Sequence, residues 1–227
     1  MGQAIGQLLP FAVGVAISPV PIIAIILMLL SKRAGLNGGS FLAGWVVGIV
    51  GASTILLVLA NTRELTSDSG APSTTSSVIK LVLGLGLLAL ARRNFAQRPT
   101  EGDTPELPAW LSKIEGLSPP KAAGLGVLLS AVNPKNLLLI AGAMMAVSQI
   151  PGLSTREQIG AVVVFVLIAI STVAAPVVIY VVIGPKAQRP LDSMKVWLGE
   201  NNAVVMAVLL LVIGVKLIGD AISGFTA

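Results

Sequence analysis

The sequence contains no cysteine and no histidine, and only 11% of its 227 residues are charged. The absence of cysteine excludes disulfide bonds, thiolate metal sites and thiol-based redox relays. The absence of histidine removes the usual zinc ligand and the usual proton shuttle near neutral pH. No nucleophile–base constellation is evident either. We therefore expect neither an enzyme nor a protein with a resident metal or cofactor.

Hydrophobic residues make up 55% of the chain, and several apolar runs exceed 18 residues. A soluble domain carries about 25% charged residues, so this composition predicts a polytopic helical membrane protein. The net charge of +5 does not indicate a nucleic-acid partner, because the basic residues flank apolar runs. The first ten residues contain no lysine or arginine, and the apolar run that follows continues to Leu30. We expect this segment to be the first transmembrane helix and not a cleaved signal.

Six transmembrane helices are expected, over residues 5–30, 40–60, 78–91, 122–150, 159–183 and 203–222. They divide the chain into a three-helix repeat (1–91), a proline-rich loop (92–120) and a second three-helix repeat (121–227). The glycine-rich residues 35–39 are expected to form a turn, and residues 185–200 a basic loop. Thr155 is the expected cap of the fifth helix.

Basic residues are distributed unequally between the two sides of the predicted bundle. If the termini share one side, that side holds only Arg63, Lys80 and Arg156. The opposite side holds Lys32, Arg33, Arg92, Arg93, Arg98, Lys113, Lys121, Lys186, Arg189 and Lys195. Because basic loops stay in the cytoplasm, we expect a multi-pass protein of the bacterial inner (plasma) membrane with both termini outside.

Two apolar helices are interrupted by proline in their middle, at Ser18-Pro19-Val20-Pro21 and at Asn133-Pro134-Lys135-Asn136. A helix rises 1.5 Å per residue, so Asn133 lies roughly 17 Å in from Ala122, near the centre of a ~30 Å hydrocarbon layer. Proline breaks or kinks a helix, and a lysine at this depth costs about 2.5–3.5 kcal/mol. The second stretch is therefore a candidate functional site; otherwise Lys135 pairs with a carboxylate or snorkels to an interface.

The two interruptions occupy corresponding places in the two halves, since Pro19 and Pro134 each lie within the first helix of a half. The stretch from Leu83 to Arg92 likewise resembles that from Leu211 to Asp220. Three helices per half would invert the second repeat relative to the first. Inverted repeats with interrupted helices at matching positions are typical of secondary transporters with a substrate site near the midplane.

The chemistry of the interruptions favours an anionic or strongly polar ligand. The start of a half-helix offers partial positive charge, Lys135 adds a full charge, and Asn133 and Asn136 add donors and acceptors. Of ten acidic residues, only Asp220 lies in an apolar run, which argues against a metal-ion substrate. Asp220 lies four residues after Lys216, so the two either form a local pair near the interface or act in coupling and gating.

These motifs resemble a known family. Ser18-Pro19-Val20-Pro21 and Asn133-Pro134-Lys135 resemble signature positions of the LysE exporter superfamily. More narrowly, LGVLLSAVNPKNLLLIAG and PLDSMKVWLGENNAVVMAVLLLVIGVKLIGD resemble the GAP family of actinobacterial glycolipid-addressing proteins, which includes sulfolipid- and glycopeptidolipid-addressing proteins. The resemblance implies a six-helix membrane protein, often a dimer, that helps to move envelope lipids outward. The matching motif positions are Ser18, Pro19, Pro21, Asn133, Pro134, Lys135 and Asn136.

The resemblance and the residues together predict a secondary transporter that exports an amphiphilic, anionic cell-envelope lipid by alternating access. The acidic motif of the metal exporters in the superfamily is absent, and so is a phosphate-binding Gly-rich loop for ATP. Two alternatives stay open: export of small solutes such as amino acids, and an accessory scaffold that docks lipid-export machinery through the 92–120 loop. Gly44 and Gly48 are spaced for close helix packing, either within the chain or across a homodimer.

Overall fold

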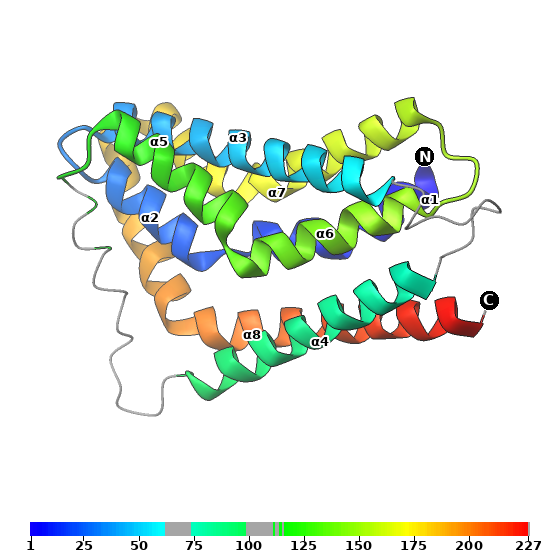
Figure 1. Ribbon diagram of the computed structural model, residues 1–227. Coiled ribbons are helices and arrows are strands. Elements are labelled where there is room, and N and C mark those ends of the chain that lie inside the picture. The colour runs from blue at the N-terminus through cyan, green and yellow to red at the C-terminus, as the bar shows by residue number, and fades with distance from the viewer. Residues whose placement is uncertain (62–73, 99–110, 112–113, 115, 227) are drawn as a thin grey trace.

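The computed structural model describes residues 1–61, 74–98, 111, 114 and 116–226, and within them it contains helices and no strand (Figure 1). Most of the 92–120 loop lies outside the described residues. The elements are α1 (Gly2–Ala16), α2 (Pro19–Leu29), α3 (Ala34–Ala60), α4 (Thr74–Ala96), α5 (Pro119–Val127), the π-helical η2 (Leu128–Val132), α6 (Pro134–Ser148), α7 (Thr155–Ile183), the 3₁₀ turn η3 (Gly184–Ala187) and α8 (Gln188–Thr226).

Four of these helices, α3, α4, α7 and α8, are long and apolar enough to cross a membrane. Two further segments qualify as bent pairs: α1 with α2, which meet at 51°, and α5–η2 with α6, which meet at 56°. The described residues therefore hold four continuous candidate spans, or up to six if each bent pair counts as one span. The prediction of an all-helical membrane protein interrupted near Pro19 and Pro134 is confirmed.

Several predicted boundaries are wrong. Residues 35–39 form no turn, because α3 already begins at Ala34, and the Asn37 side chain is buried and donates to the Leu117 carbonyl (2.9 Å). Residues 188–200 are not a loop but the first turns of α8, where Leu191 is buried and packs into the core. The cap of α7 is Ser154 and not Thr155, since the Ser154 side chain and Glu157 form a reciprocal capping box.

Glycine allows two helices to approach at backbone distance. α3 packs against α5 through Gly44 and Gly126: a Cβ on Gly44 would overlap the backbone of Ala123, and one on Gly126 would overlap the backbone of α3. Gly48 likewise faces η2 through Ser130. The glycine spacing in α3 therefore serves packing within the chain. Gly51, by contrast, has open space at its Cβ position.

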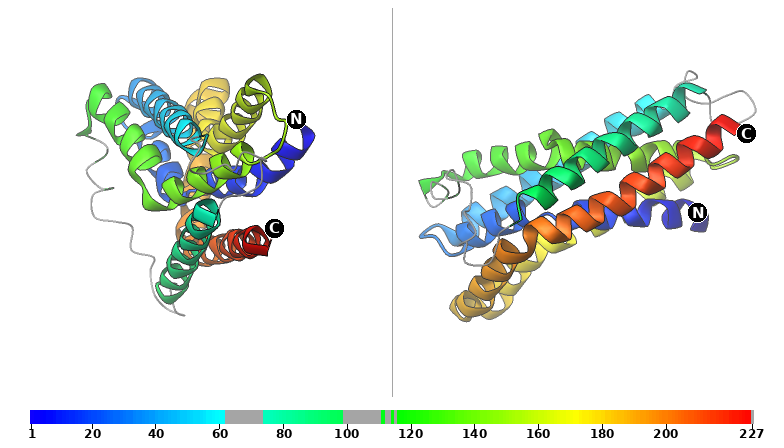
Figure 2. Two further views of the ribbon diagram at one scale, coloured as in Figure 1. Left: turned by 45° about the vertical axis from the view of Figure 1, so that its right-hand side comes forward. Right: turned by 90° about the horizontal axis from the view of Figure 1, so that it is seen from below.

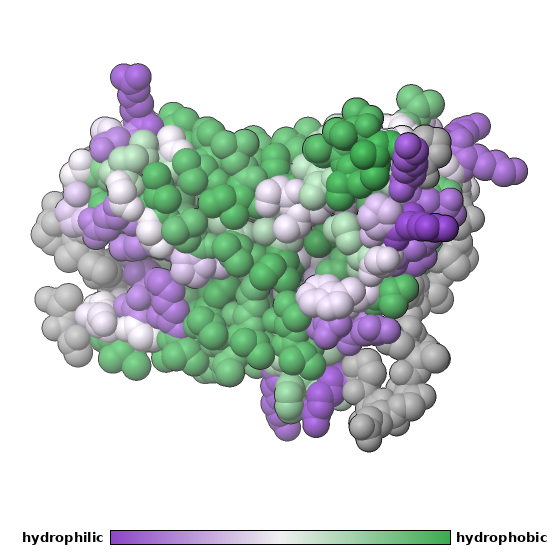
Figure 3. Space-filling view, turned by 180° about the vertical axis from the view of Figure 1, so that it is seen from behind, coloured by the Kyte–Doolittle hydropathy of each residue, from purple (hydrophilic) through white to green (hydrophobic). Residues whose placement is uncertain are grey.

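The helix bundle has two polar ends and an apolar middle section. Both chain termini lie at one end, here called the terminal end, while the α2–α3 and α7–α8 turns lie at the other, the basic end (Figure 1). α4 and α8 pack along each other, to one side of the remaining helices (Figure 2). Apolar side chains form a band between the two polar ends (Figure 3). This band is what a lipid bilayer would cover.

Candidate functional site

The first interruption separates α1 from α2. Pro19 is the first residue of α2, where its missing N–H costs nothing, and Ser18 precedes it as N-cap. Ser18 is buried, and its hydroxyl donates to the Val15 carbonyl (2.6 Å). The Thr172 hydroxyl of α7 donates to the Ala16 carbonyl. Side chains thus satisfy carbonyls that the end of a helix leaves without intrahelical partners.

The second interruption has the same construction. Pro134 is the first residue of α6, and the side chain of the N-cap Asn133 accepts a hydrogen bond from the Lys135 backbone N–H (3.0 Å). The preceding turn, η2, is π-helical, a form of helix that is frequent at functional sites. The Asn136 side chain is buried and donates back across the break to the Leu129 carbonyl (3.1 Å). Both asparagines therefore hold backbone groups at the break.

Lys135 joins the two interruptions. Its ammonium donates to the carbonyls of Gly14 and Ile17 (both 3.0 Å) and to the Ser18 hydroxyl (2.6 Å). These acceptors lie at the C-terminal end of α1, where the helix dipole favours a cation. No ion pair between described residues involves Lys135. Instead of pairing with a carboxylate, the side-chain nitrogen of Lys135 is held by three neutral acceptors.

A polar cavity of about 280 Å³ lies between the two interruptions. Six of the seven predicted substrate-binding residues line it: Ser18, Pro19, Pro21, Asn133, Pro134 and Lys135. The seventh, Asn136, does not line it and is buried. The structure thus brings together residues that are separated by more than a hundred positions in the sequence. We define this space as the polar cavity.

Four polar residues of the polar cavity were missed by sequence reasoning: Arg93, Asn94, Gln97 and Asn202. The first three were assigned to the loop, but α4 continues to Ala96, so it includes Arg93 and Asn94, and Gln97 follows directly after it. Their spacing with Leu90 follows one helical face, which is the signal that could have identified them. Arg93 adds a guanidinium group, and none of the lining residues that the structure describes is acidic. The lining is therefore suited to an anion.

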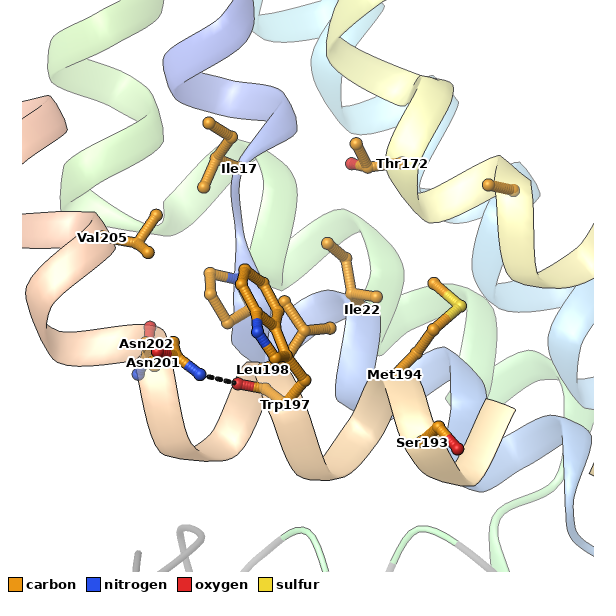
Figure 4. Close-up of a pocket in the computed structure, with 12 residues that line it drawn as sticks. Ile17, Ile22, Thr172, Ser193, Met194, Trp197, Leu198, Asn201, Asn202 and Val205 are labelled. Carbon is orange, nitrogen blue, oxygen red and sulfur yellow. Dashed lines mark hydrogen bonds between the residues drawn. The ribbon is translucent and has the colours of Figure 1, made fainter. Parts of the chain in front are cut away.

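An apolar cavity of about 560 Å³ adjoins the polar cavity, and Pro19 and Asn202 line both. Its wall includes Ile22, Ala175, Met194, Trp197, Leu198 and Val205 (Figure 4). Apart from Asn202, its Ser, Thr and Asn side chains donate to backbone carbonyls: Thr172 to Ala16, Ser193 to Arg189, and Asn201 to Trp197 (2.9 Å). These bonds leave the space between α2, α7 and the start of α8 with an apolar surface.

A second polar space, the terminal cavity, has a volume of about 370 Å³. Lys80, Lys216 and Asp220 line it, and Lys216 donates to Asp220 (2.6 Å). The predicted i, i+4 pairing is thus present, and in this conformation Asp220 engages Lys216 and not Lys135. Lys216 also lies 5.5 Å from the centre of the Phe11 ring. The two residues predicted to couple or gate therefore lie in a different cavity from Lys135.

A family model, described as Sap, sulfolipid-1-addressing protein, matches residues 8–223. No curated protein and no solved structure matches the chain. The match covers both interruptions, the polar and apolar cavities and the Lys216–Asp220 pair. The chain therefore belongs to the sulfolipid-1-addressing protein (Sap) family.

Proposed function

We propose that this protein is a secondary transporter that exports an amphiphilic, anionic cell-envelope lipid by alternating access. The family is named for addressing a sulfolipid, which fits an anionic headgroup. The observation that carries the proposal is the polar cavity, where Lys135 and Arg93 lie together and no other described lining residue is charged. A charge-assisted hydrogen bond to an anion would be stronger there than in bulk water.

An inverted repeat accounts for part of the helix packing, although the α1–α6 contact has no comparable counterpart between α5 and α2. In such a repeat, α1, α2, α3 and α4 would correspond to α5, α6, α7 and α8. The α3–α5 contact would then correspond to α7–α1, the α3–α6 contact to α7–α2, and the α4–α6 contact to α8–α2. All six of these contacts are present. The α4–α8 and α3–α7 contacts map onto themselves. This supports a first repeat over residues 1–91 and a second over 121–227. Each repeat would contribute one interrupted helix to the substrate site.

Alternating access requires a seal that separates the two ends of the pathway. The polar cavity extends to Arg93 and Gln97, near the end of α4, and the terminal cavity lies by Lys216. On α8 the buried Ile213 falls between Leu210, which lines the polar cavity, and Lys216, which lines the terminal cavity. Rocking of the repeats would open this seal. We assign Lys216 and Asp220 to coupling or gating of that step.

The basic end would face the cytoplasm and both termini the outside, in accord with the excess of basic residues in the turns at that end. Substrate would then enter from the leaflet where it is synthesised. The 92–120 loop would be cytoplasmic. In the alternative scaffold role that loop would be the docking segment.

Export of a small solute is the second candidate, because a cavity of about 280 Å³ could hold a small anion as well as a headgroup. The adjoining apolar cavity distinguishes the two, since a small hydrophilic solute has no use for it. We therefore favour the lipid.

Native mass spectrometry of the purified protein tests the proposal, with co-purified ligands compared between wild type and Arg93→Gln. Lys186→Gln, which removes a cation that lines neither the polar nor the apolar cavity, is the matched control. The proposal expects an anionic lipid bound in a fixed stoichiometry to wild type and to Lys186→Gln and depleted in Arg93→Gln. Equal lipid on all three proteins would mean annular contact only and would contradict it.

A further inference from the structure

We propose that the apolar cavity holds an acyl chain of the same lipid whose anionic headgroup occupies the polar cavity, so that Trp197 and Ala175 belong to the substrate site. This inference rests on the proposed function and extends it to the part of the lipid that the site recognises. The polar and apolar cavities share the lining residues Pro19 and Asn202, so they lie next to each other. Occupancy by a single amphiphile requires a polar space and an apolar space that are adjacent in this way.

The walls of the apolar cavity fit an acyl chain in size and in chemistry. Its volume of about 560 Å³ lies within the range of about 300–1,000 Å³ that is typical of ligand sites. Thr172, Ser193 and Asn201 could have made the wall polar, but each donates to a backbone carbonyl instead. Trp197 and Met194 supply broad, adaptable apolar surface. A hydrocarbon chain fits this wall because it needs no hydrogen-bond partner from it.

A second apolar cavity in the same protein provides an internal comparison. It has a volume of about 460 Å³ and lies between α3 and α7, where Leu57, Val162 and Val163 are among its lining residues. Its described lining residues include no charged side chain, and none of them also lines the polar cavity. Any lipid there would be held by its chain alone. Only the cavity beside Trp197 should therefore select a lipid by its headgroup.

Quenching of tryptophan fluorescence by brominated acyl chains tests this difference. The full-length protein is placed in phosphatidylcholine nanodiscs that contain a small, equal mole fraction of brominated phosphatidylglycerol or brominated phosphatidylcholine. The contribution of Trp197 is the difference between wild type and Trp197→Phe. We expect the anionic lipid to quench Trp197 with about tenfold higher apparent affinity, in line with one or more charge-assisted contacts. Equal quenching by both lipids would overturn the inference.

Three variants locate the effect. Ala175→Phe places a ring in the apolar cavity and should remove the preferential quenching, whereas Val162→Phe in the comparison cavity should not. Val163→Trp in the Trp197→Phe background reports on the comparison cavity, where both brominated lipids should quench alike. Retained preference in Ala175→Phe, or a matching preference at Val163→Trp, would contradict the assignment.

Native mass spectrometry on the same samples separates this inference from the function on which it rests. If the anionic lipid co-purifies in an Arg93-dependent manner while Trp197 shows no headgroup preference, the headgroup site stands and the acyl-chain assignment is wrong. If neither signal depends on Arg93, both proposals fail. Preferential quenching that falls in Arg93→Gln supports both.

Discussion

Replacing Lys135 with methionine removes the ammonium that connects the two interruptions and keeps most of the apolar stem. In the structure this ammonium serves two backbone carbonyls, of Gly14 and Ile17, and the Ser18 hydroxyl. The variant leaves both carbonyls without this partner, at about 1–3 kcal/mol each. Lys135 lines the polar cavity, from which water can reach the carbonyls, so we expect a total loss of about 2–4 kcal/mol.

Thermal unfolding in detergent measures this loss, and Lys121→Met is the matched control because Lys121 is exposed on α5. For a chain of this length, about 2–4 °C accompany each kcal/mol, so the melting temperature should fall by roughly 5–15 °C in Lys135→Met. The control should change by less than about 2 °C. A Lys135→Met protein as stable as the control would refute the view that the lysine connects α1 to α6.

The same variant tests the functional role. It should still insert into the membrane, because methionine is cheaper than lysine in hydrocarbon, but it should no longer export lipid. Export is measured as the appearance of labelled anionic lipid in the outer leaflet of proteoliposomes. Unchanged export in Lys135→Met would remove the lysine from the mechanism.

Three further outcomes follow from the packing and the charges. Gly44→Ala should lower the stability of the protein by about 1–3 kcal/mol because its methyl group would overlap the backbone of α5. Gly51→Ala, the control, should not destabilise the protein. Thermal unfolding of the two variants tests this difference. Asp220→Asn should change stability by less than about 1 kcal/mol, since the Lys216–Asp220 pair is partly exposed. The variant should slow export if Asp220 acts in coupling. Unchanged export would mean that the pair is only a local contact. A Gly/Ser linker in place of residues 99–110 should leave export largely intact in proteoliposomes, whereas a docking scaffold would lose its activity in cells.

The interruptions were predictable from the sequence because proline leaves few options in the middle of an apolar helix. Pro19 and Pro134 each occupy the first position of a new helix, and Asn133 has the side chain that a cap requires. The i, i+4 pair of Lys216 and Asp220 was equally local. These features depend on neighbours in the sequence, which is why they could be deduced from it.

The partners of Lys135 could not be predicted, because they are backbone carbonyls that lie more than a hundred residues away. Proline indicates which carbonyls lose a partner, as Pro21 does for Ile17 four residues earlier, but the sequence does not show which side chain will reach them. Arg93 was likewise assigned to a loop, since the end of α4 lacks a sequence signal strong enough to fix its boundary. The apolar cavity depends on which way Thr172 and Asn201 turn, and only the tertiary contacts decide that.

The connection between Lys135 and the end of α1 also constrains how the protein is made. α1 enters the membrane early in synthesis, with carbonyls at its broken end that await a partner, and Lys135 emerges from the ribosome much later. A charge on an isolated helix in hydrocarbon costs about 2.5–3.5 kcal/mol, and unsatisfied carbonyls add to the cost. Each half of the chain therefore contains polar groups without partners, the carbonyls of α1 in the first half and the Lys135 side chain in the second, and each half supplies the partner of the other. The two halves should be unstable when expressed singly and should accumulate when expressed together. Only molecules in which the two interrupted helices have paired correctly would then be stable.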